Sequence, residues 1–176
     1  GVTVNRLCAS GLTASMDAAR VIMTGDAQLM VAGGVENMTR GPWVMSKASS
    51  AYGRDQQMFD SSFGWRFINS KMKEMYGVDA MGETAENLAD LYKISREDQD
   101  KFSLWSQQKA AAASAKGRHA KEIISVSIPQ KKGDAIQFNK DEFSKPSTTL
   151  EGLGKLKASF RKEGTVTAGN ASGLND

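Results

Sequence analysis

The chemistry that this sequence can perform centres on one thiol. Cys8 is the only cysteine among 176 residues. It follows the alternating run 2–4, which predicts a strand, and precedes a stretch with the spacing of an amphipathic helix. At a strand-to-helix turn, the N–H groups and the dipole at the start of the helix favour a thiolate, so Cys8 is a candidate nucleophile. The alternative is that Cys8 is a small buried apolar side chain.

A nucleophilic cysteine also needs a base, and the sequence offers one histidine, His119. His119 follows a helix predicted to end at Gly117, where an exposed histidine complements the helix dipole. We therefore expect the base for Cys8 to come from outside these residues. The chain starts without methionine on one strand-like run and stops just after another, 165–168, so we expect it to be an internal fragment of a longer protein.

The elements around Cys8 are predicted to form a βαβ unit. Apolar residues recur at helical spacing from Leu12 to Met23. A nearly continuous apolar run from Gln28 to Ala32 is typical of a strand that is covered on both faces. Together with the strand at 2–4, these segments predict parallel pairing inside a layered α/β domain.

The middle of the chain is predicted to mix helices with a hairpin. From Glu36 the aromatic and apolar residues lose any sustained period, which predicts an irregular segment with short helices. Ser95 and Asp98 resemble a capping box that opens a long helix. The remaining predicted elements are a helix over 83–92, a β-hairpin that pairs 122–129 with 135–138, and a short amphipathic turn or helix within 141–163.

The composition is that of a soluble globular protein, and it argues against nucleic acid or a membrane as the main partner. Hydrophobic residues make up 40% and charged residues 24% of the chain, and the net charge of +3 is too small to predict binding to nucleic acid or a membrane surface. The longest nearly uncharged stretch, 27–35, is far shorter than the roughly 20 residues that cross a bilayer. Residues 1–5 show no signal peptide, and a lone cysteine fits a reducing compartment, so we expect a cytoplasmic protein.

Three stretches, 4–11 (VNRLCASG), 32–38 (AGGVENM) and 164–176 (GTVTAGNASGLND), together resemble the thiolases, and the resemblance runs over essentially the whole chain. It implies an α/β fold, namely a partial thiolase fold with a layered αβαβα core and an inserted α+β loop domain. Residues 1–37 would be part of the N-terminal core domain, 38–163 the loop domain, and 164–176 the first strand of the C-terminal core domain.

The resemblance also implies a mechanism. The cysteine that matches Cys8 takes up an acyl group as a thioester and exchanges it with coenzyme A, and its backbone N–H donates to the oxyanion that forms. Thiolases also use a histidine in a Gly-His-Pro motif, an Asn-Glu motif and a second cysteine. None of these occurs in the 176 residues, so we expect the isolated chain to be inactive.

By the same resemblance, coenzyme A is a substrate rather than a permanently bound cofactor, and no metal is expected. Ser172 would hydrogen-bond the pantetheine, while Gly152 stands where some relatives have a contacting serine. Each remaining assignment has a structural alternative as core, filler or solvated surface. The remaining candidates are Ala168, Ala171 and Phe160 as walls of the channel, Lys145 near the nucleotide, and Met72 and Met81 along the tunnel toward Cys8.

The acyl substrate is predicted from residues 64–69 and 76–82, which resemble the 3-oxoadipyl-CoA branch more than the acetoacetyl-CoA branch, where a histidine often replaces Ala80. The 3-oxoadipyl group ends in a carboxylate, which an arginine can pair with through two hydrogen bonds, and Arg66 is the candidate. The alternative for Arg66 is packing on Trp65. An acetoacetyl-CoA or general 3-ketoacyl-CoA thiolase remains the alternative activity.

The resemblance further implies CoA thioesters as partners, a homodimer or homotetramer of the full-length enzyme, and a role in the degradation of fatty acids or aromatic compounds. Two other classes compete with this hypothesis. One is a non-catalytic coenzyme A-binding or assembly piece. The other is a ketoacyl synthase, which fits less well because such enzymes lack the long insertion and the closing TAGNASG motif at 167–173.

Overall fold

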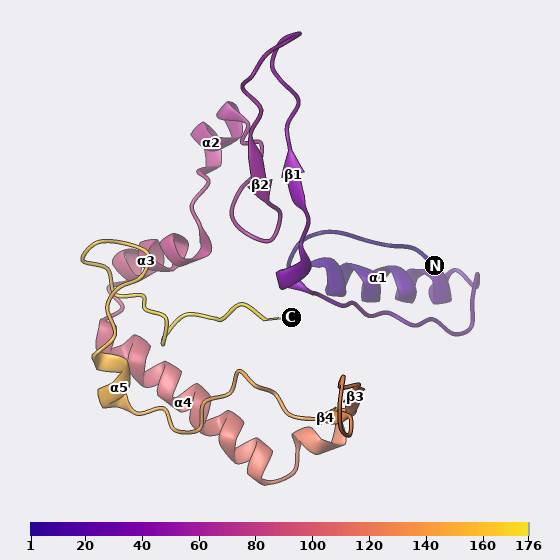
Figure 1. The fold of residues 1–176 in the computed structure, drawn as a ribbon, viewed down its shortest axis with the longest axis vertical. Helices are drawn as coiled ribbons and strands as arrows, with labels where there is room; N and C mark the ends of the chain where they lie inside the picture. Colours follow the sequence, from indigo (N-terminus) through magenta and orange to yellow (C-terminus); the bar gives the residue numbers. More distant parts are fainter. Residues whose placement is uncertain (176) are drawn as a thin grey trace. The chain divides into compact units, whose positions relative to one another are not determined.

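The computed structural model describes residues 1–175 and divides into two compact units. The first unit holds Gly1–Gly41 with Asn175, and the second holds Pro42–Leu174. Figure 1 traces the elements of both units along the chain. None of the helices within residues 1–175 is long and apolar enough to cross a membrane.

The first unit is built around α1 (Ser10–Met23), which confirms the helix expected from the spacing of Leu12 to Met23. Its only other regular element is the 3₁₀ turn η1 (Met38–Arg40). The chain leaves α1 through Gly25, whose φ of 82° is a conformation that glycine adopts without steric cost.

The strands of the predicted βαβ unit are not formed. Residues 2–4 and 28–32 carry no ladder of backbone hydrogen bonds within the described residues. Extended backbone becomes a strand only when a neighbouring strand supplies partners. The apolar pattern therefore predicted segments suited to a sheet, but no neighbouring strand pairs with them in residues 1–175.

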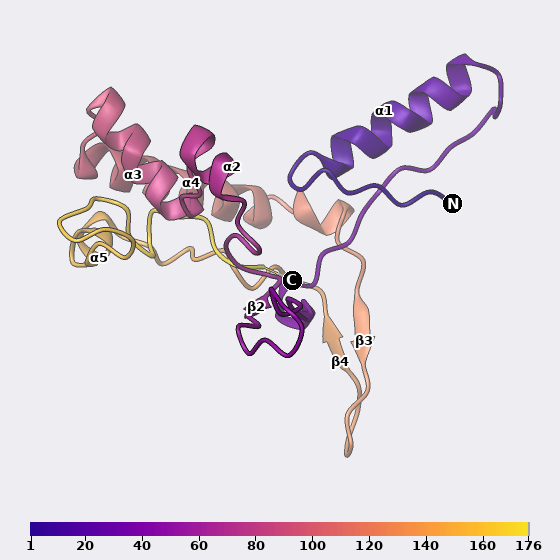
Figure 2. The same cartoon turned by 90° about the horizontal axis from the view of Figure 1, so that it is seen from above.

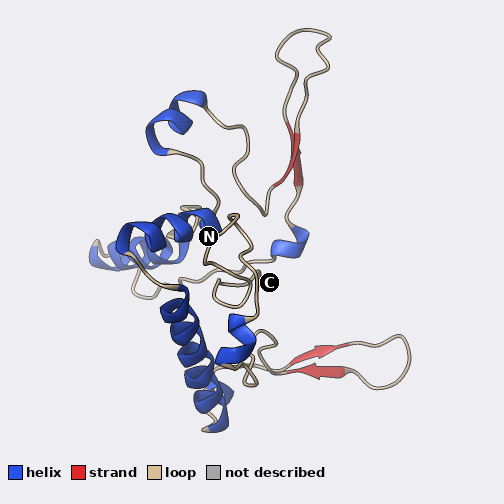
Figure 3. Cartoon of the chain, turned by 90° about the vertical axis from the view of Figure 1, so that its left-hand side faces the viewer, coloured by secondary structure: helices blue, strands red, loops and turns tan. Residues whose placement is uncertain are grey.

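The second unit opens with an antiparallel hairpin that the sequence did not predict. Strand β1 (Trp43–Met45) pairs with β2 (Met58–Asp60), with Val44 opposite Phe59. The second hairpin was predicted and is confirmed, because β3 (Val126–Ile128) pairs with β4 (Ile136–Phe138). Figure 3 shows that strand structure is confined to these two hairpins.

The helices of the second unit begin at side-chain caps in three of four cases. These helices are α2 (Ser70–Tyr76), α3 (Met81–Tyr92), α4 (Arg96–Ala115) and α5 (Leu150–Gly154). The predicted capping box is confirmed: the Ser95 hydroxyl accepts from the Asp98 N–H at 3.1 Å and donates to the Asp98 carboxylate at 2.7 Å. The side chains of Asn69 and Thr149 cap α2 and α5 by accepting backbone N–H groups of the first turn.

The core of the second unit lies where α3, α4 and α5 meet the segment 164–170, and Figure 2 shows this yellow segment running beside α5 and α3. Its buried apolar side chains are Ala89, Leu153 and Val166. Equally buried are three polar residues, Glu86, Asp100 and Thr167. A core that is half polar must satisfy these groups with hydrogen bonds, and it does so through the segment 164–170.

Candidate active site

Cys8 lies in a tight turn directly before α1, and its side chain is exposed. The Ala9 N–H donates to the Arg6 carbonyl and the Ser10 N–H to the Leu7 carbonyl, each at 3.0 Å. The Ser10 hydroxyl accepts from the Arg6 N–H at 2.9 Å and donates to the Leu7 carbonyl at 2.7 Å. These local bonds hold the thiol at the N-terminal end of α1, whose first turn contains no acidic residue.

His119 belongs to the second unit and starts the 3₁₀ turn η2 (His119–Lys121). Its Nδ1 lies 2.8 Å from the hydroxyl of Ser114, in the last turn of α4. This bond holds the ring against the helix that precedes it, which fits a structural role for His119 better than a role as the base for Cys8.

The backbone of the segment 164–173, which we call the serine loop, lies very close to side chains from other parts of the second unit. A Cβ atom on Gly164 would lie 2.2 Å from the Glu86 carboxylate, and one on Gly169 would lie 2.5 Å from a methyl carbon of Leu156. A Cβ on Gly173 would meet the ring of Phe143 at 2.1 Å. Each of these glycines therefore permits a close approach that a larger residue would allow only if the facing side chain moved.

The predicted strand over 165–168 is a turn instead. The Thr167 hydroxyl accepts from the N–H groups of Gly169 and Asn170, and the Asn170 side chain accepts from the Thr167 N–H at 2.7 Å. Thr167 makes only an isolated bridge, to Ala158. Side-chain acceptors have taken the backbone donors that a sheet would use. Val166 and Thr167 are consequently buried, while Ala168 and Ser172 are exposed and Ala171 is half-buried.

Glu86, on α3, anchors the first half of the serine loop. Its carboxylate accepts from the N–H groups of Thr165 at 2.9 Å and Val166 at 2.8 Å, and from the Thr165 hydroxyl at 3.1 Å. Burial acts to raise the pKa of this carboxyl, but the hydrogen bonds from Thr165 and Val166, with the charge of Arg161, lower the pKa overall. The structure thus favours an ionised carboxylate beneath the loop.

Phe160 is brought to the start of α3. A Cβ on Gly82 would lie 2.2 Å from two ring atoms of Phe160, so the ring packs on the helix backbone next to Met81. Arg161 fixes this arrangement by donating to Glu83 at 2.7 Å, and it also bonds Asp90 and Asn87 on the same helix. Phe160, predicted as a wall of the channel, and Met81, predicted along the tunnel, therefore lie at one end of α3.

The other predicted site residues lie elsewhere in the second unit. Met72 is on α2 and is about half exposed. Lys145 has an exposed side chain, and its backbone N–H donates to the Gln107 side chain at 2.9 Å. Arg66 is half-buried and donates from Nη1 to the Gly64 carbonyl at 2.7 Å. The roles assigned to these residues stay predictions.

Sequence reasoning missed the buried carboxylates of Glu86 and Asp100. One signal was available for each. Glu86 shares the buried face of α3 with Ala89, three residues on, and Asp100 is four residues after Arg96, with which it forms an ion pair at 2.8 Å. Among the described residues, no group of three His, Cys, Asp or Glu side chains is arranged to hold a metal.

The comparisons with known proteins agree on one family. The family model described as "Thiolase, N-terminal domain" matches residues 1–176. A β-ketoadipyl-CoA thiolase of Acinetobacter baylyi is 58% identical over 174 residues, which cover 99% of this chain and 43% of that protein. A 3-oxoadipyl-CoA/3-oxo-5,6-dehydrosuberyl-CoA thiolase of Escherichia coli is 55% identical over 176 residues, covering 100% of this chain and 44% of that protein.

A solved structure matches over the same range. The crystal structure of human mitochondrial 3-ketoacyl-CoA thiolase superposes with a TM-score of 0.81 at 36% identity, covering 97% of this chain and 42% of that one. This match confirms the predicted fold class. The chain spans less than half the length of the relatives that it matches.

Proposed function

The chain belongs to the thiolase family, and we propose that, as part of a longer enzyme, it carries the cysteine that accepts the acyl group in the cleavage of a 3-oxoacyl-CoA. The observation that carries the proposal is the exposed thiol of Cys8 at the N-terminal end of α1. The turn around Cys8 is held by its own hydrogen bonds, so the thiol is positioned before any substrate arrives.

In the proposed reaction the Cys8 thiolate attacks the 3-oxo carbon of the substrate, and the N–H of Cys8 donates to the developing oxyanion. The bond between C2 and C3 breaks, the acetyl-CoA carbanion takes a proton, and the rest of the acyl chain stays on Cys8 as a thioester. The thiol of coenzyme A then attacks this thioester, gives up its proton to a base, and leaves as a shortened acyl-CoA while Cys8 is regenerated.

The rest of the longer enzyme is proposed to complete both the chemistry and the packing. The proton transfers need a base, and the chain's only histidine is bonded to Ser114 on α4. Large apolar side chains of α1, including Leu12 and Met23, are exposed within residues 1–175. Apolar surface of this kind marks a contact with other protein. We therefore expect the isolated chain to be inactive.

Coenzyme A is proposed to bind along the serine loop, as a substrate rather than a resident cofactor. The loop buries Val166 and Thr167 and leaves the hydroxyl residue Ser172 exposed, so Ser172 can donate to an amide carbonyl of the pantetheine. The apolar candidates for the channel and tunnel, together with the nucleotide-end lysine, are Ala168, Ala171, Phe160, Met72, Met81 and Lys145.

The proposed acyl substrate is 3-oxoadipyl-CoA. The names of the relatives that are 58% and 55% identical support this choice over acetoacetyl-CoA. Arg66 is proposed to pair with the terminal carboxylate, since the bond from its Nη1 to the Gly64 carbonyl fixes the guanidinium in the loop that precedes α2. The homodimer or homotetramer expected of the full-length enzyme stays a prediction.

The proposal is tested in the full-length enzyme with Cys8→Ala. We expect cleavage of 3-oxoadipyl-CoA to be lost, and we expect peptide mass spectrometry of the wild type treated with acetyl-CoA to find an acetyl group on Cys8. Ser15→Ala is the matched control, because Ser15 lies on α1 and its hydroxyl donates to the Gly11 carbonyl at 3.1 Å, within the same helix. Turnover by Cys8→Ala, or an acetyl group on another residue alone, contradicts the proposal.

A further inference from the structure

Two buried carboxylates lie beneath the serine loop, and the reaction as described uses neither. Glu86 on α3 is 2% exposed and Asp100 on α4 is 3% exposed. A buried carboxylate is costly unless hydrogen-bond donors surround it. For both residues, donors come from the serine loop, residues 164–173, although the loop is 70 or more positions away in the sequence.

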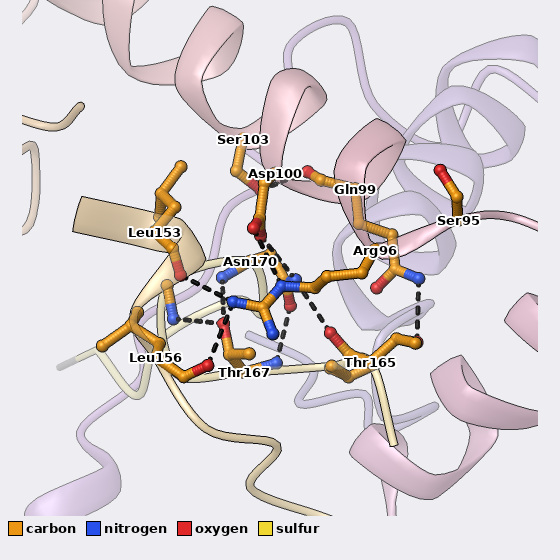
Figure 4. Close-up of polar contacts among 12 residues, drawn as sticks. Ser95, Arg96, Gln99, Asp100, Ser103, Leu153, Leu156, Thr165, Thr167 and Asn170 are labelled. Carbon is orange, nitrogen blue, oxygen red and sulfur yellow. Dashed lines mark hydrogen bonds and ion pairs between the residues drawn. The ribbon is translucent and has the colours of Figure 1, made fainter. Parts of the chain in front are cut away.

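Asp100 links α4 to the centre of the loop (Figure 4). Its Oδ1 accepts from Nδ2 of Asn170 at 3.0 Å, and its Oδ2 accepts from Nε of Arg96 at 2.8 Å. The Asn170 side chain in turn accepts from the Thr167 N–H at 2.7 Å and donates to the Thr165 carbonyl at 3.1 Å. The amide of Asn170 therefore closes the turn and attaches it to α4.

The second carboxylate oxygen of Asp100, Oδ2, connects to α5 through Arg96. Arg96, held by Asp100, donates from Nη2 to the carbonyls of Leu153 at 2.6 Å and Leu156 at 3.1 Å. The side chains of Leu153 and Leu156 are the ones that pack against Gly169. Asp100 thus orients both groups that enclose the turn, the amide of Asn170 from within and α5 from outside.

Glu86 fixes the point where the chain enters the loop. It accepts the N–H groups of Thr165 and Val166, and Gln99 on α4 adds a bond to the Thr165 hydroxyl at 2.9 Å. Gly164 leaves the space that the carboxylate occupies. Two fixed points, at the entry and at Asn170, define the backbone conformation up to two residues before Ser172.

We propose that Glu86 and Asp100 are positioning residues for the coenzyme A site, because they hold the serine loop in the conformation that presents Ser172. The inference rests on the proposed binding of coenzyme A by this loop. Neither carboxylate touches the substrate, and each acts through the backbone of the loop.

The test uses Asp100→Asn and Glu86→Gln in the full-length enzyme. In Asp100→Asn the new NH2 group must face a donor, either on Arg96 or on Asn170, so one contact is lost. We expect the KM for coenzyme A to rise about fivefold or more in both variants. We expect kcat at saturating coenzyme A, and the rate at which iodoacetamide alkylates Cys8, to stay within about twofold of the wild type.

The exchange variant Asp100→Asn/Asn170→Asp provides the rescue. It reverses the donor and the acceptor between positions 100 and 170 and keeps acceptors for Arg96 and for the Thr167 N–H, while it loses the bond to the Thr165 carbonyl. We expect its KM for coenzyme A to return part of the way toward the wild-type value. A KM at or above that of Asp100→Asn alone overturns the proposal, and the exchange variant remains informative if the single variant does not fold.

Two further variants distinguish a positioning role from a role in stability alone, and from failure of the proposed coenzyme A site. Ser95→Ala removes the cap of α4 without touching the loop, so it should lower the melting temperature and leave the KM unchanged. If it raises the KM as much as Asp100→Asn does at an equal loss of melting temperature, the role of Asp100 is stability alone and the proposal fails. Ser172→Ala tests the proposed function itself, because an unchanged KM for coenzyme A in this variant contradicts binding through Ser172. If Ser172→Ala raises the KM while Asp100→Asn and Glu86→Gln keep the wild-type KM, only the positioning role is contradicted.

Discussion

The ring of Phe160 packs directly on the backbone of Gly82, where a Cβ atom would lie 2.2 Å from both Cγ and Cδ1 of the ring. Gly82 is the second residue of α3. A larger residue at this position would have to displace the ring of Phe160. The contact joins the start of α3 to the segment that leads into the serine loop.

Gly82→Ala should therefore destabilise the full-length enzyme despite its better helix propensity. Overpacking of this kind costs about 1 to 3 kcal/mol, and the displaced Phe160 should also raise the KM for coenzyme A. Differential scanning calorimetry and steady-state kinetics measure the two effects. Gly154→Ala is the control, because Gly154 lies in α5 and, beyond its chain neighbours and its own helix backbone, no atom of residues 1–175 lies within 4 Å of the added Cβ. This variant should leave both quantities unchanged. A Gly82→Ala protein as stable as the control would contradict the packing described.

Acid should weaken the second unit through Glu86. The pKa of its carboxyl is below the ordinary value of 4.5, because the bonds from Thr165 and Val166 outweigh the opposing effect of burial. The ionised carboxylate therefore stabilises the fold fully above about pH 4.5, and this contribution is lost as the pH falls through the lowered pKa. Glu86→Gln should flatten the decline in stability in that range, measured by urea unfolding from about pH 3 to about pH 7.

The control for the acid experiment is Glu97→Gln. Glu97 pairs with Lys101 on the exposed side of α4, and both side chains are more than half exposed, so its loss should barely change the pH dependence. If Glu86→Gln declines with acid as steeply as the wild type and the control, Glu86 is not the group that responds.

Arg66→Ala should change the choice of acyl substrate. Removing a charge-assisted pair costs about 1.5 to 3 kcal/mol, so kcat/KM for 3-oxoadipyl-CoA should fall about 10- to 100-fold, while that for 3-oxohexanoyl-CoA should change little. Arg54→Ala, at an exposed arginine between β1 and β2, is the matched control and should affect neither substrate. Equal losses for both substrates, or equal use of both by the wild type, would remove the proposed role of Arg66.

The isolated 176-residue chain should not cleave acetoacetyl-CoA when coenzyme A is supplied. It holds the proposed acyl acceptor Cys8 but, by comparison with the family motifs, none of the other catalytic groups. Release of acetyl-CoA can be followed by chromatography, with the isolated Cys8→Ala chain as the control. Turnover that disappears in that control would show that the chain alone carries a complete active site.

Local interactions explain which parts of the fold could be predicted. Helices α1 and α4 were predicted because their hydrogen bonds join residues four apart and Ser95 marks the start of α4. The β3–β4 hairpin was predicted from a short polar turn between two apolar runs. The β1–β2 hairpin was missed because the long segment 46–57 separates its strands, whereas a hairpin is recognised in a sequence by a short turn between two apolar runs.

In the candidate site, too, the features held by local interactions were predicted and those held by distant residues were not. The turn at Cys8 was predicted because its bonds lie within residues 5–10. The burial of Glu86 was missed because its stabilising donors on Thr165 and Val166 come from a segment about 80 positions away, and its spacing from Ala89 on α3 was a weak local signal. The expected strand at 165–168 was wrong because the distant Glu86 carboxylate accepts from the N–H groups of Thr165 and Val166, and the nearby Asn170 side chain accepts from that of Thr167.

The three glycines of the serine loop bear on how such a sequence can be varied. Each faces particular side chains: Gly164 faces Glu86, Gly169 faces Leu153 and Leu156, and Gly173 faces Phe143. A single substitution at any of these glycines requires the facing side chain to move, so it should lower the stability of the fold. Pairing an alanine at 173 with a smaller residue at 143, in the same clone, should recover part of that loss, because the two positions are in contact and their effects are not additive.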